Sequence, residues 1–151
     1  MRTTAEILLF ASVTMNAVLL AFIAGVLRRV MNDMSAPAFK AFVNSLVRHS
    51  KRSPLMLTLL NAPFAGAILF IYLYGIGDRW IISGAAVWFV AGSIAKLVKV
   101  PVYKRIAALD ENDLDRLGAE RKKLNDANLF QAVLNSVAAV LMLLAFWGKS
   151  F

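Results

Sequence analysis

Residues 127–147 read ANLFQAVLNSVAAVLMLLAFW, and this stretch without a charged side chain decides the fold class. A helix rises about 1.5 Å per residue, so a helix of this length crosses a hydrocarbon core of about 30 Å. Inside such a core every backbone amide and carbonyl group needs a hydrogen-bond partner within the protein, and a helix supplies those partners itself. The stretch therefore predicts a membrane-spanning helix.

Three further apolar stretches of similar length precede it, at residues 6–27, 55–76 and 80–100. Hydrophobic residues make up 60% of the 151 residues, and the mean hydropathy is +0.66, which is more apolar than an ordinary soluble domain. The four stretches and their connections use nearly the whole chain and leave no segment for a separate soluble core. We therefore predict an all-α fold, a polytopic membrane four-helix bundle that forms one transmembrane domain over residues 1–151.

Basic residues are distributed unequally between the predicted connections. Fourteen of the 17 Lys and Arg residues lie between the first two stretches, or at and after the inner end of the third. They are Arg28, Arg29, Lys40, Arg48, Lys51, Arg52, Lys96, Lys99, Lys104, Arg105, Arg116, Arg121, Lys122 and Lys123. Because cytoplasmic connections carry an excess of Lys and Arg, we predict that both longer connections are cytoplasmic and both termini lie outside. We expect the protein to be integral to a membrane, the cytoplasmic membrane of a bacterium.

The formal net charge of +8 follows from this distribution. Basic residues next to membrane spans attract anionic lipid, so we expect membrane lipid as a partner and no nucleic acid.

The first connection contains a predicted amphipathic helix. Ser35 and Pro37 suit a helix start, and apolar residues follow at helical spacing. These residues are Phe39, Phe42, Val43, Leu46 and Val47. We predict a short interfacial helix between spans one and two, which either covers the inner end of the bundle or gates access of a lipid-soluble ligand.

The second connection is expected to contain one or two short helices. Pro101 should end or kink the third span near the interface. Asp110 or Asn112 can cap a new helix that contains Leu114 and Leu117.

Three amide side chains interrupt the last apolar stretch. Asn128, Gln131 and Asn135 recur every three or four residues, so they share one helical face. Lipid would leave these amides without partners, so we predict that this face points into the bundle, with Asn16 and Asn61 near enough to join it. These five residues are the candidate ligand-binding residues. They either hold helices together, at about 0.6 kcal/mol per hydrogen bond, or form a polar cleft for a carbonyl, phenol or lipid headgroup.

Other kinds of chemistry find no support in the residues. The chain has no cysteine, and its one histidine, His49, lies in the basic first connection. No Asp, Glu or His stands in the middle of a predicted span, and Lys96 and Lys99 are expected to snorkel to the inner interface. We therefore expect no metal and no cofactor, and no set of catalytic residues can be named.

Two short motifs carry a family resemblance. Val100 and Pro101 form a Val-Pro pair at the end of the third span, the polar Tyr103 follows shortly after, and Asn128 stands near the start of the fourth span. With these motifs, residues 24–68 and 98–145 resemble a widespread family of small four-helix membrane proteins that includes the fungal anthrone oxygenases. The resemblance implies the four-helix architecture and a cofactor-free oxidation of an aromatic substrate.

Two classes of function remain open at this stage. In the first, the protein is a noncatalytic bundle that associates with itself, with lipid or with a larger membrane complex. In the second, it is an enzyme or carrier for a hydrophobic, aromatic or quinone-like small molecule held by the five amides. The sequence favours the first class, because it offers no acid, base, nucleophile or metal-ligand set.

Overall fold

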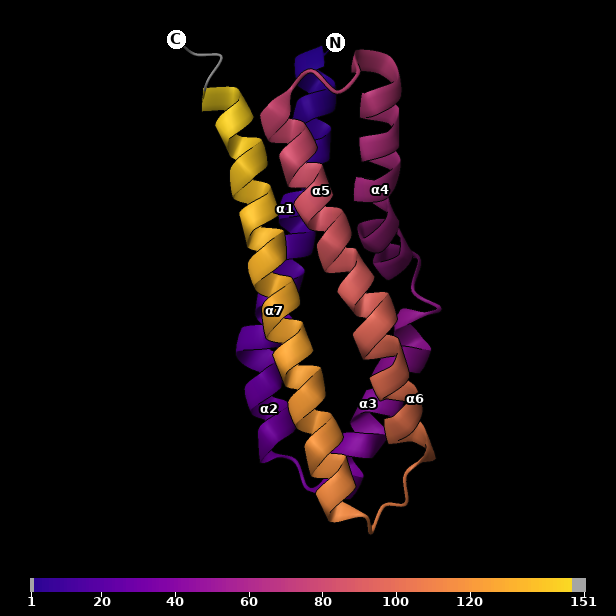
Figure 1. Cartoon of the computed structure of the whole chain (residues 1–151). Coiled ribbons are helices and arrows are strands. Elements are labelled where there is room, and N and C mark those ends of the chain that lie inside the picture. Colours follow the sequence, from indigo (N-terminus) through magenta and orange to yellow (C-terminus); the bar gives the residue numbers. More distant parts are fainter. Residues whose placement is uncertain (1, 148–151) are drawn as a thin grey trace.

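The computed structural model describes residues 2–147, and the regular structure in this range is helical (Figure 1). Two of the long helices contain a π-helical turn between α-helical segments, and one short helix lies between the first two long ones. The elements are α1 (Arg2–Phe22), η1 (Ile23–Leu27), α2 (Arg28–Asp33), α3 (Ala36–Ser50), α4 (Pro54–Tyr74), α5 (Arg79–Ile94), η2 (Ala95–Lys99), α6 (Val100–Ala108) and α7 (Leu114–Trp147).

Four helices are long and apolar enough to cross a membrane: Arg2–Asp33, Pro54–Tyr74, Arg79–Ala108 and Leu114–Trp147. The predicted all-α class and the four apolar helices are thereby confirmed. Three of these helices run well past the predicted apolar stretches. The 34 residues of α7 extend over about 50 Å, whereas a hydrocarbon core is about 30 Å thick. The first described residues and the end of α7 lie at the same end of the bundle, the upper end in Figure 1.

We call this upper end the outer end and the opposite end the inner end, after the orientation predicted from the sequence. The outer half of the bundle is held by an apolar core. Helix α7 packs along both α5 and α1, whereas α4 packs chiefly against α1. The buried residues of this outer core are Leu9, Val13, Phe70, Ile81, Trp88, Ala138, Met142 and Ala145. At the rim, Arg2 lies 3.0 Å from Glu6 and 3.5 Å from Asp78, which ties the start of α1 to the start of α5.

Helix α5 packs tightly against α7 at Gly84. A Cβ atom at this position would lie 2.6 Å from Cγ of Met142 and 2.8 Å from the backbone oxygen of Ala138. A backbone oxygen cannot move aside as a flexible side chain can. Glycine at position 84 is therefore required for the observed contact between the two helices.

We expect Gly84→Ala to destabilise the bundle by about 1–3 kcal/mol, the usual cost of overpacking a close contact. Gly92→Ala is the matched control, because a Cβ there would meet no atom within 4 Å and alanine favours the helix by about 1 kcal/mol. The stability of both variants is measured by unfolding in mixed detergent, monitored by circular dichroism. A Gly84→Ala midpoint at or above that of Gly92→Ala would contradict the close contact.

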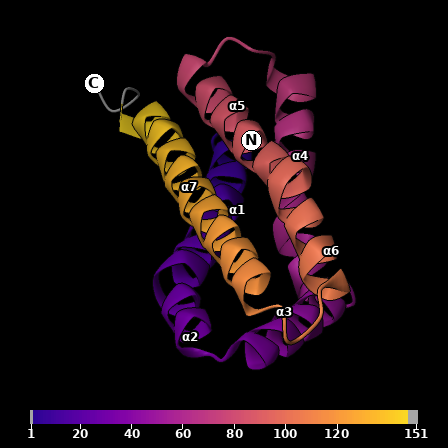
Figure 2. The ribbon, with the colours of Figure 1, turned by 60° about the horizontal axis from the view of Figure 1, so that its bottom comes forward.

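The inner end of the bundle has a second apolar core, in which α3 takes part. Figure 2 shows α3 crossing this end between α2 and α6. The buried residues of the inner core are Met31, Phe39, Val43, Val102, Ile106, Leu117 and Leu124. Polar contacts add to the packing: Nζ of Lys40 donates to the backbone oxygen of Leu109 at 2.7 Å, and the guanidinium of Arg121 lies 4.4 Å from the ring centroid of Phe39. The predicted helix between spans one and two thus exists, and its buried face contacts protein.

The second connection differs from the prediction. The third long helix does not end at Pro101 but runs on to Ala108. Pro101 directly follows the π-helical turn η2, and a local π adjustment of this kind accommodates a proline within a long helix. No separate short helix precedes the fourth span, since α7 is continuous from Leu114. The cap is Asp113 and not the predicted Asp110 or Asn112: Oδ1 of Asp113 accepts from the backbone nitrogen of Arg116 at 3.3 Å, whereas Asp110 bonds the backbone nitrogen of Asn112 before the helix begins.

Candidate functional site

The amide face of α7 lies inside the bundle, as the helical spacing predicts. Asn128, Gln131 and Asn135 are 2%, 6% and 1% exposed, respectively. They continue the buried face that begins with Leu117 and Leu124 in the inner core. Nδ2 of Asn135 donates to the backbone oxygen of Gln131 at 2.8 Å, so part of this face is bonded within α7 itself.

Lys99 joins the amide face, which corrects the expectation that it snorkels to the interface. Its side chain comes from η2, at the junction with α6, and the residue is 8% exposed. Nζ donates to Oε1 of Gln131 at 2.9 Å. Lys96, on the same turn, is exposed as expected. One lysine of the predicted pair therefore lies inside the bundle, and its hydrogen bond links the third long helix to α7.

Two π-helical turns flank α7 at this level. Both η1 on the first long helix and η2 on the third contact α7. Within long α-helices, π-helical turns are rare and occur frequently at functional sites. Their position beside the amide face makes this level of the bundle a candidate functional site.

Asn16 reaches the same depth from α1. Helices α1 and α7 run in opposite directions (Figure 1). Val13 and Ala138 share the outer core, and Leu20 packs with Ala132 further in. Asn16 is therefore level with Asn135. It is 4% exposed, and its Nδ2 lies 3.4 Å from the backbone oxygen of Leu59 on α4.

Asn61 does not join this group, contrary to the prediction. It is exposed on the face of α4, where its Nδ2 donates to the backbone oxygen of Leu57 at 2.7 Å. The prediction assumed that lipid leaves an amide without partners. An asparagine can instead bond the carbonyl one turn back in its own helix, which satisfies its donor without a second helix.

We call Asn16, Lys99, Asn128, Gln131 and Asn135 the polar layer. On α7 the three amides lie between Leu124 of the inner core and Ala138 of the outer core, and Lys99 lies between Trp88 and Val102 of the same two cores. The polar layer is thus enclosed by apolar packing on both sides.

The polar layer has unused hydrogen-bonding capacity. Oδ1 of Asn16, Asn128 and Asn135 is buried without a hydrogen-bond partner among the described residues. An ammonium group carries three donors, and Lys99 uses one of them on Gln131. A cation with free donors beside amide oxygens can bind and orient a group that presents an acceptor oxygen and a hydroxyl. Ammonium and amide groups of this kind can position a molecule by hydrogen bonds.

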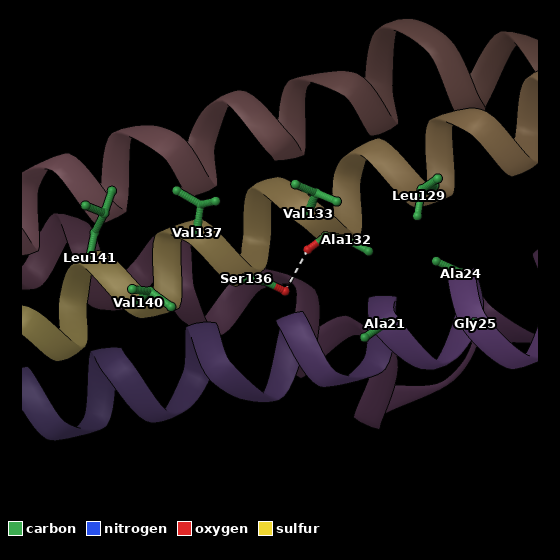
Figure 3. A pocket seen from close by; sticks show the side chains of 10 residues that line it. All are labelled: Ala21, Ala24, Gly25, Leu129, Ala132, Val133, Ser136, Val137, Val140 and Leu141. Atoms are coloured by element: carbon green, nitrogen blue, oxygen red, sulfur yellow. Dashed lines mark hydrogen bonds between the residues drawn. The ribbon is translucent and has the colours of Figure 1, made fainter.

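An apolar groove of about 530 Å³ lies beside α7, lined by sequence neighbours of the three amides but by no residue of the polar layer itself. Figure 3 shows it between α7 and the inner half of the first helix, with Ser136 bonded to the backbone oxygen of Ala132 at 3.0 Å. Small residues make the groove possible, namely Ala21, Ala24, Gly25 and Ala132. The groove was not predicted as a site, although the small residues of the first span stand one turn apart in the sequence.

No metal-binding group was found in residues 2–147, in the sense of three or more His, Cys, Asp or Glu side chains that lie together. Searches against protein-family models, curated protein sequences and solved structures found no match to this chain. The fold and the polar layer define the class: an all-helical protein with four helices able to span a membrane and a polar layer between two apolar cores.

Proposed function

We propose that this protein binds a hydrophobic small molecule with an oxygen-bearing polar head, aromatic or quinone-like, in the polar layer of the bundle. The burial of Lys99 carries the proposal. A buried ammonium is costly unless an anionic or strongly accepting group faces it, and the side-chain partner of Lys99 is a neutral amide. An acceptor oxygen of a ligand would compensate the charge and use the remaining donors.

The proposed role is that of a binding protein or carrier. The polar layer can hold and orient a molecule, and we assign no catalytic residue to it. The resemblance to the family that includes the anthrone oxygenases stays a prediction, since no comparison tests it.

Asn135→Leu tests whether the amides bind a ligand. We expect the protein, extracted gently from its membrane, to lose a copurifying small molecule in this variant while it stays folded, because the polar anchor is lost and the apolar walls remain. Asn61→Leu is the matched control, since it removes an exposed amide bonded only to its own helix. Native mass spectrometry in detergent measures retention.

Two results would oppose the proposal. The first is a wild-type protein that retains no small molecule. The second is equal retention by both variants, with a change in stability for Asn135→Leu near the 0.6 kcal/mol of a single interhelical bond. Either result would mean that the amides only hold helices together.

We also propose the orientation in the membrane, on the basis of the distribution of basic residues. Both longer connections face the cytoplasm of a bacterium, α3 lies at the inner membrane surface, and both termini lie outside. The described chain starts and ends at one end of the bundle, opposite α3, which supports placing both termini on one side of the membrane and α3 on the other; the basic residues decide which side is which.

Cysteine labelling tests the orientation, since the chain has no cysteine of its own. A cysteine at Asn44 or Asn112 should resist a membrane-impermeant thiol reagent in intact cells, and one at Gly77 should react. Ser150, a second outer position suggested by the sequence, lies outside the described residues. Labelling in the opposite pattern would reverse the proposed orientation.

The second candidate function is a noncatalytic component of a homo-oligomer or a larger membrane complex. The groove beside α7 favours it, because a floor of small residues lets a further helix approach closely. The same native mass spectra separate the two candidates: a reproducible protein partner without a small molecule supports this second candidate.

A further inference from the structure

A second pocket lies at the inner end of the bundle, apart from the polar layer. It has a volume of about 420 Å³ and is formed between the end of α3, the following connection and α6. Four basic residues line it: Arg48 from α3, Lys51 and Arg52 from the following connection, and Lys104 from α6. All four are exposed, so a molecule can reach them from outside the bundle.

These four cations have no carboxylate partner within the part of the chain that the structure describes. None of them forms an ion pair there. From residue 34 to residue 109 the sequence contains one acidic residue, Asp78, and Asp78 lies at the opposite end of the bundle beside Arg2. The positive charge of the pocket is therefore not neutralised by the protein.

A neighbouring pocket on the other side of α6 shows the contrast. It also contains basic residues, but Glu120 lies among them. Arg105 approaches Glu120 at 3.0 Å and Lys123 approaches it at 2.8 Å. In that pocket the protein supplies its own anion, whereas in the pocket between α3 and α6 an anion has to come from elsewhere.

The rest of the lining is amphipathic. Val100 lies on the pocket wall one residue beyond Lys99, at the inner end of the apolar stretch, and Tyr103 adds a phenol ring with its hydroxyl group. Near the basic residues, the backbone nitrogens of Lys51 and Arg52 donate to the backbone oxygens of Val47 and His49, so these two carbonyl groups at the end of α3 are already hydrogen-bonded. The pocket thus joins an apolar wall to a cluster of cations just beyond the end of the apolar stretch of the third long helix.

We propose that the pocket between α3 and α6 binds a phosphate group, carried by the headgroup of an anionic phospholipid. Arg and Lys are the side chains that hold phosphate oxygens best, and basic pockets between membrane helices on the cytoplasmic side bind anionic headgroups. This site is separate from the polar layer and does not depend on a ligand there, although its place on the cytoplasmic side rests on the orientation proposed above. A soluble phosphate-bearing molecule would present the same chemistry, so the test includes both sources.

The lipid arm uses the full-length protein in micelles that contain phosphatidylcholine and phosphatidylglycerol in equal amounts. Native mass spectrometry measures the ratio of the two lipids retained. The pocket variant replaces the four cations with glutamine: Arg48→Gln, Lys51→Gln, Arg52→Gln and Lys104→Gln. We expect wild type to prefer phosphatidylglycerol. The pocket variant should lose at least about tenfold of that preference, since each of the four cations near an anionic lipid contributes severalfold.

A matched control removes the same charge elsewhere at the inner end. Its substitutions are Arg28→Gln, Arg29→Gln, Arg116→Gln and Lys122→Gln. It should keep the preference of wild type, and circular dichroism should show native helix content in both variants. The soluble arm records phosphorus NMR line broadening of millimolar inorganic phosphate in micelles of phosphatidylcholine alone.

Each outcome decides the proposal. A phosphatidylglycerol preference lost only in the pocket variant supports the phospholipid site. Phosphate broadening lost only in the pocket variant, without a lipid preference, supports the phosphate site and assigns it to a soluble molecule instead. Equal losses in the pocket variant and the control, or no preference and no broadening in wild type, overturn the proposal.

Discussion

Lys99→Met is expected to weaken binding in the polar layer by roughly 10- to 100-fold, because a hydrogen bond to a charged group is worth about 1.5–3 kcal/mol and 1.4 kcal/mol is a factor of ten. Methionine keeps the length of the side chain and removes its charge and its donors. The substitution leaves Oε1 of Gln131 without its donor, which costs about 1–3 kcal/mol, but it also removes the cost of burying a charge, so the variant should stay folded.

The measurement is the retention of the copurifying small molecule over a dilution series, read by native mass spectrometry. Lys96→Met is the matched control, because Lys96 lies on the same π-helical turn but is exposed. Retention that falls equally in both variants would indicate a general effect of charge at the inner interface. Unchanged retention in Lys99→Met would remove the main support for a ligand in the polar layer.

Phe39→Ala is expected to cost about 3–5 kcal/mol in the docking of α3, the usual cost of truncating a fully buried phenylalanine. Phe39 is 0% exposed in the inner core, and its ring also receives the guanidinium of Arg121. Because α3 is a 15-residue helix joined to the bundle by short connections, the loss should release this helix locally while the four long helices stay together.

Hydrogen exchange of residues 36–50 measures this release. A loss of 3–5 kcal/mol corresponds to protection that falls by more than about 100-fold. Leu46→Ala is the control on the same helix, since Leu46 is 36% exposed and contributes less to the core. If α3 were held only by lipid, the two substitutions would have similar effects, and the packing of α3 against α2, α6 and α7 would carry little of its stability.

The sequence predicted one face of the candidate site and missed the residue that defines it. The spacing of Asn128, Gln131 and Asn135 was sufficient to place them inside the bundle, because polar residues on an apolar helix mark a face by contrast. A signal for Lys99 also existed: it stands 18 residues, or five helical turns, after the buried Ile81. A lysine at the end of a span usually snorkels to the interface. Lys99 instead has a hydrogen-bond acceptor inside the bundle, Gln131 of α7, which only the tertiary structure reveals.

What the sequence determined by itself was the number of helices long and apolar enough to cross a membrane, the amphipathic α3 and the amide face of α7, since each depends on local composition or on a periodic contrast between polar and apolar residues. The tertiary structure decided which apolar faces meet, that Asn16 joins the layer while Asn61 faces outward, and that α3 buries Phe39 in protein. The physical reason lies in the solvent: lipid and protein interior are both apolar, so a helix such as α4 has no periodic contrast that tells its buried face from its lipid face. Only the positions of the neighbouring helices determine which face of a helix is buried, and therefore which side chains form the site.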